Sequence, residues 1–207
     1  MTNIAVFASG RGTNFKNLID AQNSGFLPGK IALLVAAKEG IGAIETARTY
    51  QVPYHVYEGS QASTSQTSLI PVLNTFHIDF IALAGWLKYI RTDLLALYKQ
   101  RIVNIHPALL PFFGGSGMYG MNVHRAVWAS GMQISGATVH FVDEQYDHGI
   151  IIYQQAIPLE PMDSPQRIAE KVLKVEHDIY PRAIKMVLNG NYEISGNRFI
   201  PGPLETE

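Results

Sequence analysis

Three polar residues in the middle of the chain have the types and spacing for acid–base chemistry: Asn104, His106 and Asp147. Asn104 and His106 are two residues apart at the end of a short apolar run, so a strand there would project both side chains from one face at its carboxyl end. A histidine is the usual proton shuttle near neutral pH, and an asparagine amide can stabilise a developing oxyanion. Taken alone, Asn-x-His-Pro favours a structural role for His106, in which the ring only bonds a backbone carbonyl.

The third residue comes from a polar segment, 140–149, that holds three acids. We interpret Asp143 and Glu144 as part of a polar turn between two strands. Asp147 stands just before the next apolar run, where its side chain can point into a cleft. A carboxylate there, beside His106, would favour the imidazolium and orient the ring.

A glycine-containing turn near the start of the sequence, Ser9-Gly10-Arg11-Gly12-Thr13-Asn14, could bind a phosphate. It lies between an apolar run and a helical pattern, so backbone N–H groups around Gly12 would face an anion at a helix N-terminus, with Thr13 and Asn14 as further donors. The spacing matches neither G-x-G-x-x-G nor a Walker motif, so dinucleotide binding is not indicated. An ordinary tight turn in which Thr13 caps the helix fits equally well.

Metal and nucleophile sites find little support in the sequence. The chain has seven histidines and no cysteine, yet no histidine pair has the i, i+4 spacing of a helical zinc site and no H-E-x-x-H occurs. His140 and His148 lie near Asp147, which leaves a metal possible but not favoured. A serine hydrolase is disfavoured because G-x-S-x-G is absent. We therefore predict a site without a metal.

The elements that must position these residues alternate between short apolar runs and helical patterns. The patterns predict strands at 4–8, 30–37, 54–57, 80–84 and 102–105, and helices at 14–21, 41–50, 66–76 and 92–98. This alternation indicates an α/β fold, a doubly wound, mostly parallel and Rossmann-like sheet with helices on both faces. Ligands of such sheets bind at the carboxyl ends of the strands.

After residue 106 the pattern changes. A glycine-rich loop at 112–120 suggests a functional lid, although a solvated linker fits as well. A helix is predicted at 123–130, and two strands at 136–142 and 150–159 are expected to be antiparallel because only a short loop joins them.

The last part of the sequence predicts a long helix and a hairpin. Ser164 is a suitable N-cap for a helix that ends near Leu188, before Asn189-Gly190. The tail from Tyr192 resembles a short hairpin. The fold therefore has an antiparallel C-terminal portion beside its parallel sheet.

Composition limits the class of protein. Hydrophobic residues make up 47% and charged residues 16% of the 207 residues, enough apolar material for one domain with a core. The formal net charge of −1 argues against nucleic acid or an anionic membrane as a partner. No apolar run reaches the ~18 residues of a membrane span, and the first residues are unlike a signal peptide. We expect a cytoplasmic protein, monomeric or homodimeric, and the lack of cysteine fits a reducing compartment.

Together, and in this order, the features resemble the folate-dependent formyltransferases. The resemblance runs almost end to end, through SGRGTN, LAGWLKYI, VNIHPALLP, HRAV, GATVHFVDEQYDHG and EHDIYP. NIHPxLLP and VHxVxxxxDxG mark the family, and the SGxG[ST]N opening and the EHxIYP helix resemble its glycinamide ribonucleotide branch. The resemblance implies an enzyme of purine biosynthesis that transfers a formyl group from 10-formyltetrahydrofolate to the amine of glycinamide ribonucleotide, directly through a tetrahedral intermediate. It implies a single domain, 1–207, with a phosphate-binding half (1–100) and a folate-binding and catalytic half (101–207).

The resemblance also implies binding roles for individual residues. The ribonucleotide phosphate would be bound by Gly12, Thr13 and Asn14, and the substrate's hydroxyl or amine groups by Glu176. The folate would contact a segment after the fourth strand, largely through backbone groups, and one residue of the fifth: Leu87, Lys88, Tyr89, Ile90 and Asn104.

The catalytic roles that the resemblance implies fall on the three residues singled out first. Asn104 would contact the formyl oxygen, and His106 would act as the general acid/base, protonated when it stabilises the oxyanion. Asp147 would set the ionisation of His106 and order a water that relays protons. Neither a metal nor a covalent enzyme intermediate is implied.

Three departures from the family pattern affect the binding side. Segment 60–68 lacks an arginine that is often found there. Lys88 stands where arginine is common, which keeps the charge but not the bidentate fork. The glycine-rich loop is longer than the family's short form.

Two other readings stay open. Another formyl-folate enzyme, a formyltetrahydrofolate hydrolase or a formyltransferase for an amino sugar or tRNA, would share the three central residues. We expect a basic C-terminal domain of the tRNA enzyme and an N-terminal regulatory domain of the hydrolase, and we see neither pattern. A non-catalytic nucleotide-binding or sensor protein on the same scaffold is the second reading. The phosphate-binding turn argues against another formyl-folate enzyme, and the triad of Asn104, His106 and Asp147 argues against a non-catalytic protein.

Overall fold

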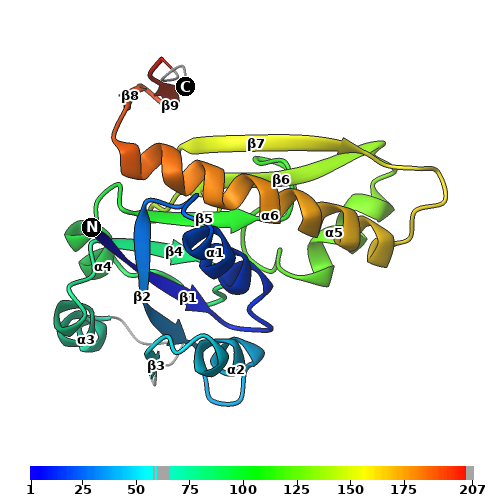
Figure 1. Ribbon diagram of the computed structural model, residues 1–207. Coiled ribbons are helices and arrows are strands. Elements are labelled where there is room, and N and C mark those ends of the chain that lie inside the picture. The colour runs from blue at the N-terminus through cyan, green and yellow to red at the C-terminus, as the bar shows by residue number, and fades with distance from the viewer. Residues whose placement is uncertain (58, 60–65, 204–207) are drawn as a thin grey trace.

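One seven-stranded sheet organises the chain (Figure 1). The computed structural model describes residues 1–57, 59 and 66–203. The sheet order is β3-β2-β1-β4-β5-β6-β7, and a separate hairpin is formed by β8 and β9. The strands are β1 Thr2–Ala8, β2 Gly29–Ala36, β3 Tyr54–Val56, β4 Phe80–Leu83, β5 Ile102–His106, β6 Ile134–Phe141, β7 Ile151–Pro158, β8 Tyr192–Ser195 and β9 Arg198–Pro201. The helices are α1 Thr13–Asn23, α2 Gly42–Thr49, η1 Thr67–Leu69 (a 3₁₀ turn), α3 Ile70–Thr75, α4 Thr92–Leu97, α5 Met121–Ala129 and α6 Pro165–Asn189.

The first five strands are parallel, and the order of the sheet turns back at β1. β2 and β3 lie on one side of β1, and β4 and β5 lie on the other. The prediction of a doubly wound, mostly parallel sheet is confirmed. At such a switch point the loops after β1 and β4 diverge, and the crevice between them is the usual ligand site. Because β4 pairs with β5, the sheet is continuous across residue 100, the boundary expected between the phosphate-binding half and the folate-binding and catalytic half.

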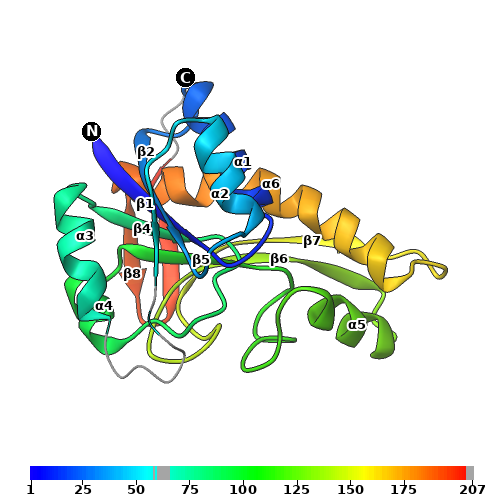
Figure 2. The ribbon, with the colours of Figure 1, turned by 90° about the horizontal axis from the view of Figure 1, so that it is seen from below.

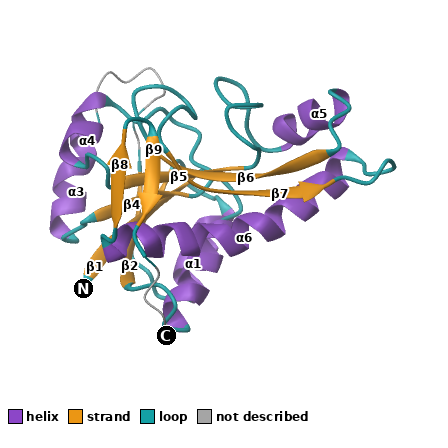
Figure 3. Cartoon of the chain, turned by 90° about the horizontal axis from the view of Figure 1, so that it is seen from above, coloured by secondary structure: helices purple, strands orange, loops and turns teal. Residues whose placement is uncertain are grey.

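Alternation along β1 explains why both faces of the sheet are buried. Ile4 and Val6 belong to a core shared with α1, α2 and α6, whereas Ala5 and Phe7 belong to a core shared with α3 and α4. Figure 2 shows α3 and α4 together, away from α1 and α2. Figure 3 shows α6 running along β6 and β7, both of which it contacts. The residues in these cores are almost without solvent contact, so helices cover both faces of the sheet.

The last strands reverse direction, as their short connection predicts. β5 pairs antiparallel with β6, and β6 with β7. In this register Asn104 lies opposite His140, and His106 lies opposite Thr138. The seam between the parallel and antiparallel parts therefore runs along the strand that carries Asn104 and His106.

Both ends of the long helix α6 follow the sequence prediction. The Ser164 hydroxyl accepts a hydrogen bond from the Arg167 N–H at 3.2 Å, which satisfies one free donor of the first turn. Gly190 ends the helix with a left-handed φ of 69°. The hairpin of β8 and β9 is confirmed as well. Within the described residues, no helix has both the length and the apolar character to cross a membrane.

One predicted helix differs in its bounds, and the alternative cap considered for the first turn is not observed. The helix expected at 66–76 is a 3₁₀ turn followed by α3, because Pro71 has no N–H to donate to the carbonyl of residue 67. Gln66 is therefore not helical. At the start of α1 the capping position is taken by Gly12 in a left-handed conformation, and Thr13 is already the first helical residue, with no capping hydrogen bond from a side chain.

Candidate active site

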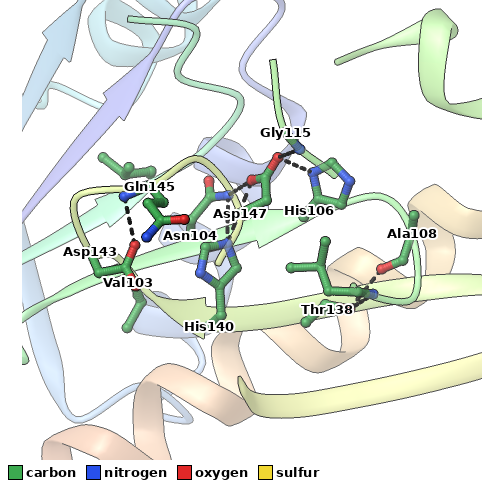
Figure 4. A network of polar contacts seen from close by, with 12 residues as sticks. Val103, Asn104, His106, Ala108, Gly115, Thr138, His140, Asp143, Gln145 and Asp147 are labelled. Carbon is green, nitrogen blue, oxygen red and sulfur yellow. Dashed lines mark hydrogen bonds and ion pairs between the residues drawn. The ribbon is translucent and has the colours of Figure 1, made fainter. Parts of the chain in front are cut away.

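The end of β5 and the loop between β6 and β7 bring the three predicted residues together (Figure 4). Asn104 Nδ2 donates to Asp147 Oδ1 at 3.3 Å. His106 Nδ1 lies 3.5 Å from Asp147 Oδ2. Asn104 and His106 point the same way because they alternate on one strand. Asn104 and Asp147 are therefore 43 positions apart in the sequence, yet their side chains are in direct contact.

Asp147 is fixed from several sides at once. Its side chain is 11% exposed, and Oδ2 accepts the Gly115 N–H at 2.9 Å. Its backbone φ is 54°, a left-handed conformation that aspartate and asparagine adopt more readily than most residues. Burial acts to raise the pKa of Asp147, but the nearby rings of His140 and His106 and the Gly115 N–H together hold that pKa below its ordinary value. The carboxylate is therefore ionised at neutral pH.

The ionisation of His106 differs from the expectation. Burial lowers the pKa of His106, and the negative charge of Asp147 and the Phe113 carbonyl only partly offset this effect. The ring is 3% exposed, so the cation loses more hydration than Asp147 returns. Asp147 acts in the expected direction, but the protonated ring expected at neutral pH is not the favoured state here.

Both ring nitrogens of His106 face oxygen atoms. Nε2 lies 2.8 Å from the carbonyl oxygen of Phe113, and Nδ1 faces Asp147. A neutral imidazole has one N–H and can donate to only one of the two. His106 thus makes both the backbone carbonyl contact expected of a structural histidine and the carboxylate contact expected of a catalytic histidine. Because Phe113 lies in the glycine-rich loop 112–120, that loop covers one edge of the ring.

His140 joins the cluster and was considered in the sequence only as a metal ligand. Its Nε2 lies 3.1 Å from Asn104 Nδ2 and 3.7 Å from Asp147 Oδ1. Its Nδ1 donates to the Phe141 carbonyl at 2.7 Å, so Nε2 of a neutral ring accepts from Asn104. Both N–H groups of the Asn104 amide are then engaged within the cluster. The signal that could have found His140 is its register opposite Asn104 in an antiparallel pair. Among the described residues, no group of three or more His, Cys, Asp or Glu could hold a metal ion.

A pocket opens beside the cluster, with a volume of about 390 Å³ that includes the open space at its mouth. It is lined by the segment after β4, by β4, β5 and β6, and by the loop that carries Asp147. The residues are Leu83, Trp86, Lys88, Tyr89, Ile90, Asn104, His140, Val142, Asp143, Gln145, Tyr146 and Asp147. Lys88, Tyr89 and Ile90 are among the predicted folate contacts. Leu87 is not in the lining, and its side chain points outward with 44% exposure. Trp86 and Tyr146 were not predicted.

Lys88 is engaged by protein groups at the edge of this pocket. Its ammonium donates to the Gly59 carbonyl and lies 4.8 Å from the ring centroid of Tyr57, a cation–π distance. The segment that lacks the family's arginine, 60–68, lies outside the described residues from 60 to 65.

The turn after β1 reaches α6 at the same edge of the sheet. Gly12 has a φ of 80°, and a Cβ there would lie 2.7 Å from the Cα of Ala43, so only glycine fits. Asn14 Nδ2 donates to Glu176 Oε2 at 3.4 Å, and both side chains are buried. Burial raises the pKa of Glu176 to about 7, against the opposing effect of the Asn14 hydrogen bond. Two features that lie 162 residues apart in sequence thus form one polar contact.

Known proteins match this chain over most of its length. The family model described as "Formyl transferase" matches residues 2–184. Phosphoribosylglycinamide formyltransferase of Bacillus subtilis is 35% identical over 92% of this chain and 97% of its own length. The crystal structure of glycinamide ribonucleotide transformylase 1 from Symbiobacterium toebii superposes with a TM-score of 0.89 at 32% identity, over 98% of this chain and 95% of that one.

A plant relative is longer than this chain. The chloroplastic phosphoribosylglycinamide formyltransferase of Arabidopsis thaliana is 41% identical over 87% of this chain. The match covers 63% of the Arabidopsis protein, so the chain spans about three fifths of the length of that relative.

Proposed function

Because the chain belongs to the formyl transferase family, we propose that it transfers a formyl group from 10-formyltetrahydrofolate to the amine of glycinamide ribonucleotide, a step of purine biosynthesis. The observation that carries the proposal is the cluster of Asn104, His106 and Asp147, of which Asn104 and Asp147 line a pocket. A phosphate-type turn with Glu176 beside it lies at the same edge of the sheet. The relatives that carry this function in their names support the choice of substrates.

The pocket suits a flat heteroaromatic ring with a polar end. Trp86, Tyr89 and Ile90 supply apolar and aromatic surface, while Asn104 and Asp147 supply polar groups at one end. A formyl folate bound with its pterin against the apolar wall would present its formyl group to the polar end. The backbone groups of the segment after β4 are available for the pterin edge.

Asn104 is suited to receive the negative charge that develops on the formyl oxygen. Its Nδ2 is fixed by Asp147 and His140, so the amide nitrogen rather than the oxygen points into the cluster. In the transition state one of those N–H groups would donate its hydrogen bond to the oxyanion, in addition to or in place of its present acceptor. A single donor of this kind contributes on the order of 3 kcal/mol to the transition state.

His106 is suited to carry the proton. Burial keeps the ring neutral, so it is free to accept a proton, and the carboxylate of Asp147, 3.5 Å away, stabilises the imidazolium once the proton from the attacking amine arrives. The ring then returns the proton to the departing folate nitrogen. For Nε2 to take part, the Phe113 carbonyl must move off it, so the loop 112–120 opens or shifts during turnover.

The ribonucleotide would bind across the turn and α6. Its phosphate would meet backbone N–H groups at Gly12, Thr13 and Asn14, at the N-terminus of α1. Glu176 would accept from the substrate's hydroxyl or amine groups. Ordering of a proton-relay water by Asp147 is part of the same proposal. The cytoplasm is the compartment we propose, because the lack of cysteine fits a reducing environment, whereas the Arabidopsis relative is named chloroplastic.

The test separates transfer from hydrolysis, because a formyl-folate hydrolase would use the same three side chains with water. The protein is incubated with a 10-formyl folate, with and without glycinamide ribonucleotide, and the deformylated folate is followed by its absorbance. We expect a signal only when the ribonucleotide is present. The same signal with water alone would assign the chain to the hydrolases, and no signal in either arm would refute both assignments.

A further inference from the structure

The wall of the pocket formed by 86–91 has no regular secondary structure. A segment of this kind must satisfy its backbone N–H and C=O groups through partners outside itself, and those partners decide its shape. One end is held where the Leu87 N–H donates to the Ser9 hydroxyl at 2.9 Å. The other end is held by a residue of segment 60–68 that does not line the pocket.

That residue is Gln66, whose side chain makes two hydrogen bonds to the segment. Its Nε2 donates to the carbonyl of Tyr89 at 3.0 Å, and its Oε1 accepts the Arg91 N–H at 2.9 Å. Gln66 is 1% exposed, so water does not compete for either bond. The two bonds flank Ile90, which is 4% exposed and lines the pocket. The carboxamide thus replaces the strand partner that this stretch of backbone lacks.

Gln66 is itself held in place. Its backbone N–H donates to Asp93 Oδ2 at 2.8 Å, in the first turn of α4, and its carbonyl accepts the Leu69 N–H at 2.9 Å. The side chain therefore extends from a backbone anchored to the helix that follows the segment. A residue fixed in this way transmits the position of α4 and of the 3₁₀ turn to the pocket wall.

The segment also reaches the opposite wall through Tyr89. The Tyr89 ring meets the Tyr146 ring edge-on with centroids 5.2 Å apart, and the Tyr89 hydroxyl donates to the Glu144 carbonyl. Tyr146 and Glu144 belong to the loop that carries Asp147. A shift of the Tyr89 backbone would therefore alter the mouth of the pocket on both sides.

We infer that Gln66 is a positioning residue for the folate pocket: its carboxamide holds the backbone of Tyr89 and Arg91 in the conformation that receives the formyl folate. The inference rests on the proposed function, because it names the ligand of that pocket. Gln66 does not line the pocket, so it affects folate binding indirectly, by setting the fraction of molecules in which segment 86–91 has the binding conformation. The apparent dissociation constant rises in inverse proportion to that fraction.

The test replaces the carboxamide without changing the length of the side chain. In Gln66→Met both hydrogen bonds are lost, and we expect the dissociation constant for 10-formylfolate to rise about tenfold, the effect of losing about one to two net hydrogen bonds. At saturating folate the turnover number is expected to stay within about threefold of wild type, and the KM for the ribonucleotide to be unchanged, because the reacting groups are untouched.

Asn3 supplies a matched control. Its carboxamide also makes two hydrogen bonds to backbone groups, because Nδ2 donates to the carbonyls of Phe76 at 3.2 Å and His77 at 3.1 Å, but these lie at the opposite end of β1 and β4. Asn3→Leu is expected to lower stability and leave folate affinity unchanged. Hydrogen exchange provides a second readout: the Arg91 amide should exchange faster in Gln66→Met and not in Asn3→Leu. If Gln66→Met does not fold, Gln66→Glu at pH 8 replaces the donor to the Tyr89 carbonyl with a carboxylate oxygen that repels this carbonyl, and it is expected to weaken folate binding about threefold or more.

The outcomes separate this inference from the proposed function. A wild-type protein that binds 10-formylfolate, with a folded Gln66 variant that binds it equally well, overturns the role of Gln66 alone. Equal losses of folate affinity in the Gln66 and Asn3 variants would also overturn it, since the cause would be general destabilisation. A wild-type protein that binds no formyl folate overturns the proposed function and this inference with it.

Discussion

Replacing Asp147 by asparagine tests the central electrostatic argument. Asparagine has nearly the same shape, tolerates the left-handed φ of 54°, and its amide oxygen can still accept the Gly115 N–H. The substitution therefore removes the negative charge 3.5 Å from His106 Nδ1 and the acceptor of the Asn104 N–H, and it leaves the backbone in place. We expect a folded protein with a damaged proton-transfer step.

The magnitude follows from that distance. Two unit charges about 3.5 Å apart attract by roughly 5 kcal/mol at an effective dielectric constant of 20, and part of this is offset by hydration and relaxation of the variant. We expect a net loss on the order of 3 kcal/mol when His106 becomes protonated in the transition state, or about a hundredfold in kcat. Folate affinity should change much less, because the charge acts on a ring that is neutral before the reaction.

The pH dependence of kcat/KM in Asp147→Asn provides a second test, because the direction in which its acid limb moves is predicted. The carboxylate of Asp147 raises the pKa of His106 against the larger, opposite effect of burial. Without the carboxylate the pKa of His106 falls further, so the acid limb of kcat/KM that reports a neutral base should move to lower pH. An upward movement of that limb would contradict the assignment of His106 as the base.

The assay is formyl transfer followed by absorbance, with stability measured by urea unfolding. Asp163→Asn is the matched control, because Asp163 is also a buried carboxylate, 7% exposed, but pairs with Lys171 at the start of α6. The control should lose stability and keep kcat. A folded Asp147→Asn enzyme with kcat within about fivefold of wild type and an unmoved acid limb would refute the reasoning.

Three further substitutions probe the surroundings. Burial raises the pKa of Glu176 to about 7 in the folded protein, against 4.5 in the unfolded chain, so the wild-type free energy of unfolding falls as pH rises between these values. The glutamine in the variant Glu176→Gln does not titrate. In urea unfolding the stability of the variant relative to wild type should therefore rise by up to about 3 kcal/mol between pH 4.5 and 8. Gly12→Ala places a Cβ 2.7 Å from the Ala43 Cα and should cost about 2 kcal/mol in the same measurement, with a larger rise in the KM of the ribonucleotide than of the folate. Tyr180→Phe removes a buried hydroxyl that donates to the Leu83 carbonyl at 2.8 Å, and should lower the unfolding free energy by about 1 to 2 kcal/mol while kcat stays within about threefold.

The sequence predicted the sheet and its reversal well, because those features depend on local patterns. Continuous apolar runs such as the one in β1 are typical of strands buried on both faces, and they predict a parallel sheet. The spacing of Asn104 and His106 was enough to place both side chains on one face. The cap at Ser164 and the glycine at 190 marked the ends of α6 correctly.

What the sequence did not reveal depends on tertiary contacts. Gln66 stands in a stretch rich in serine, threonine and glutamine, which suggests a solvated surface, yet its side chain is buried against a segment more than 20 residues away. His140 acquires its role only from its register opposite Asn104. The direction of the His106 pKa shift required its burial, because the nearby carboxylate alone points the other way.

The position of α6 in the chain has a consequence for synthesis. All seven strands of the main sheet precede this helix, and α6 packs against β6 and β7 on one apolar face, in one core with Val139 and Ile152. A ribosome that releases about 5–20 residues per second therefore exposes that apolar face before its cover exists. A translational pause just before residue 165 would prolong this exposure.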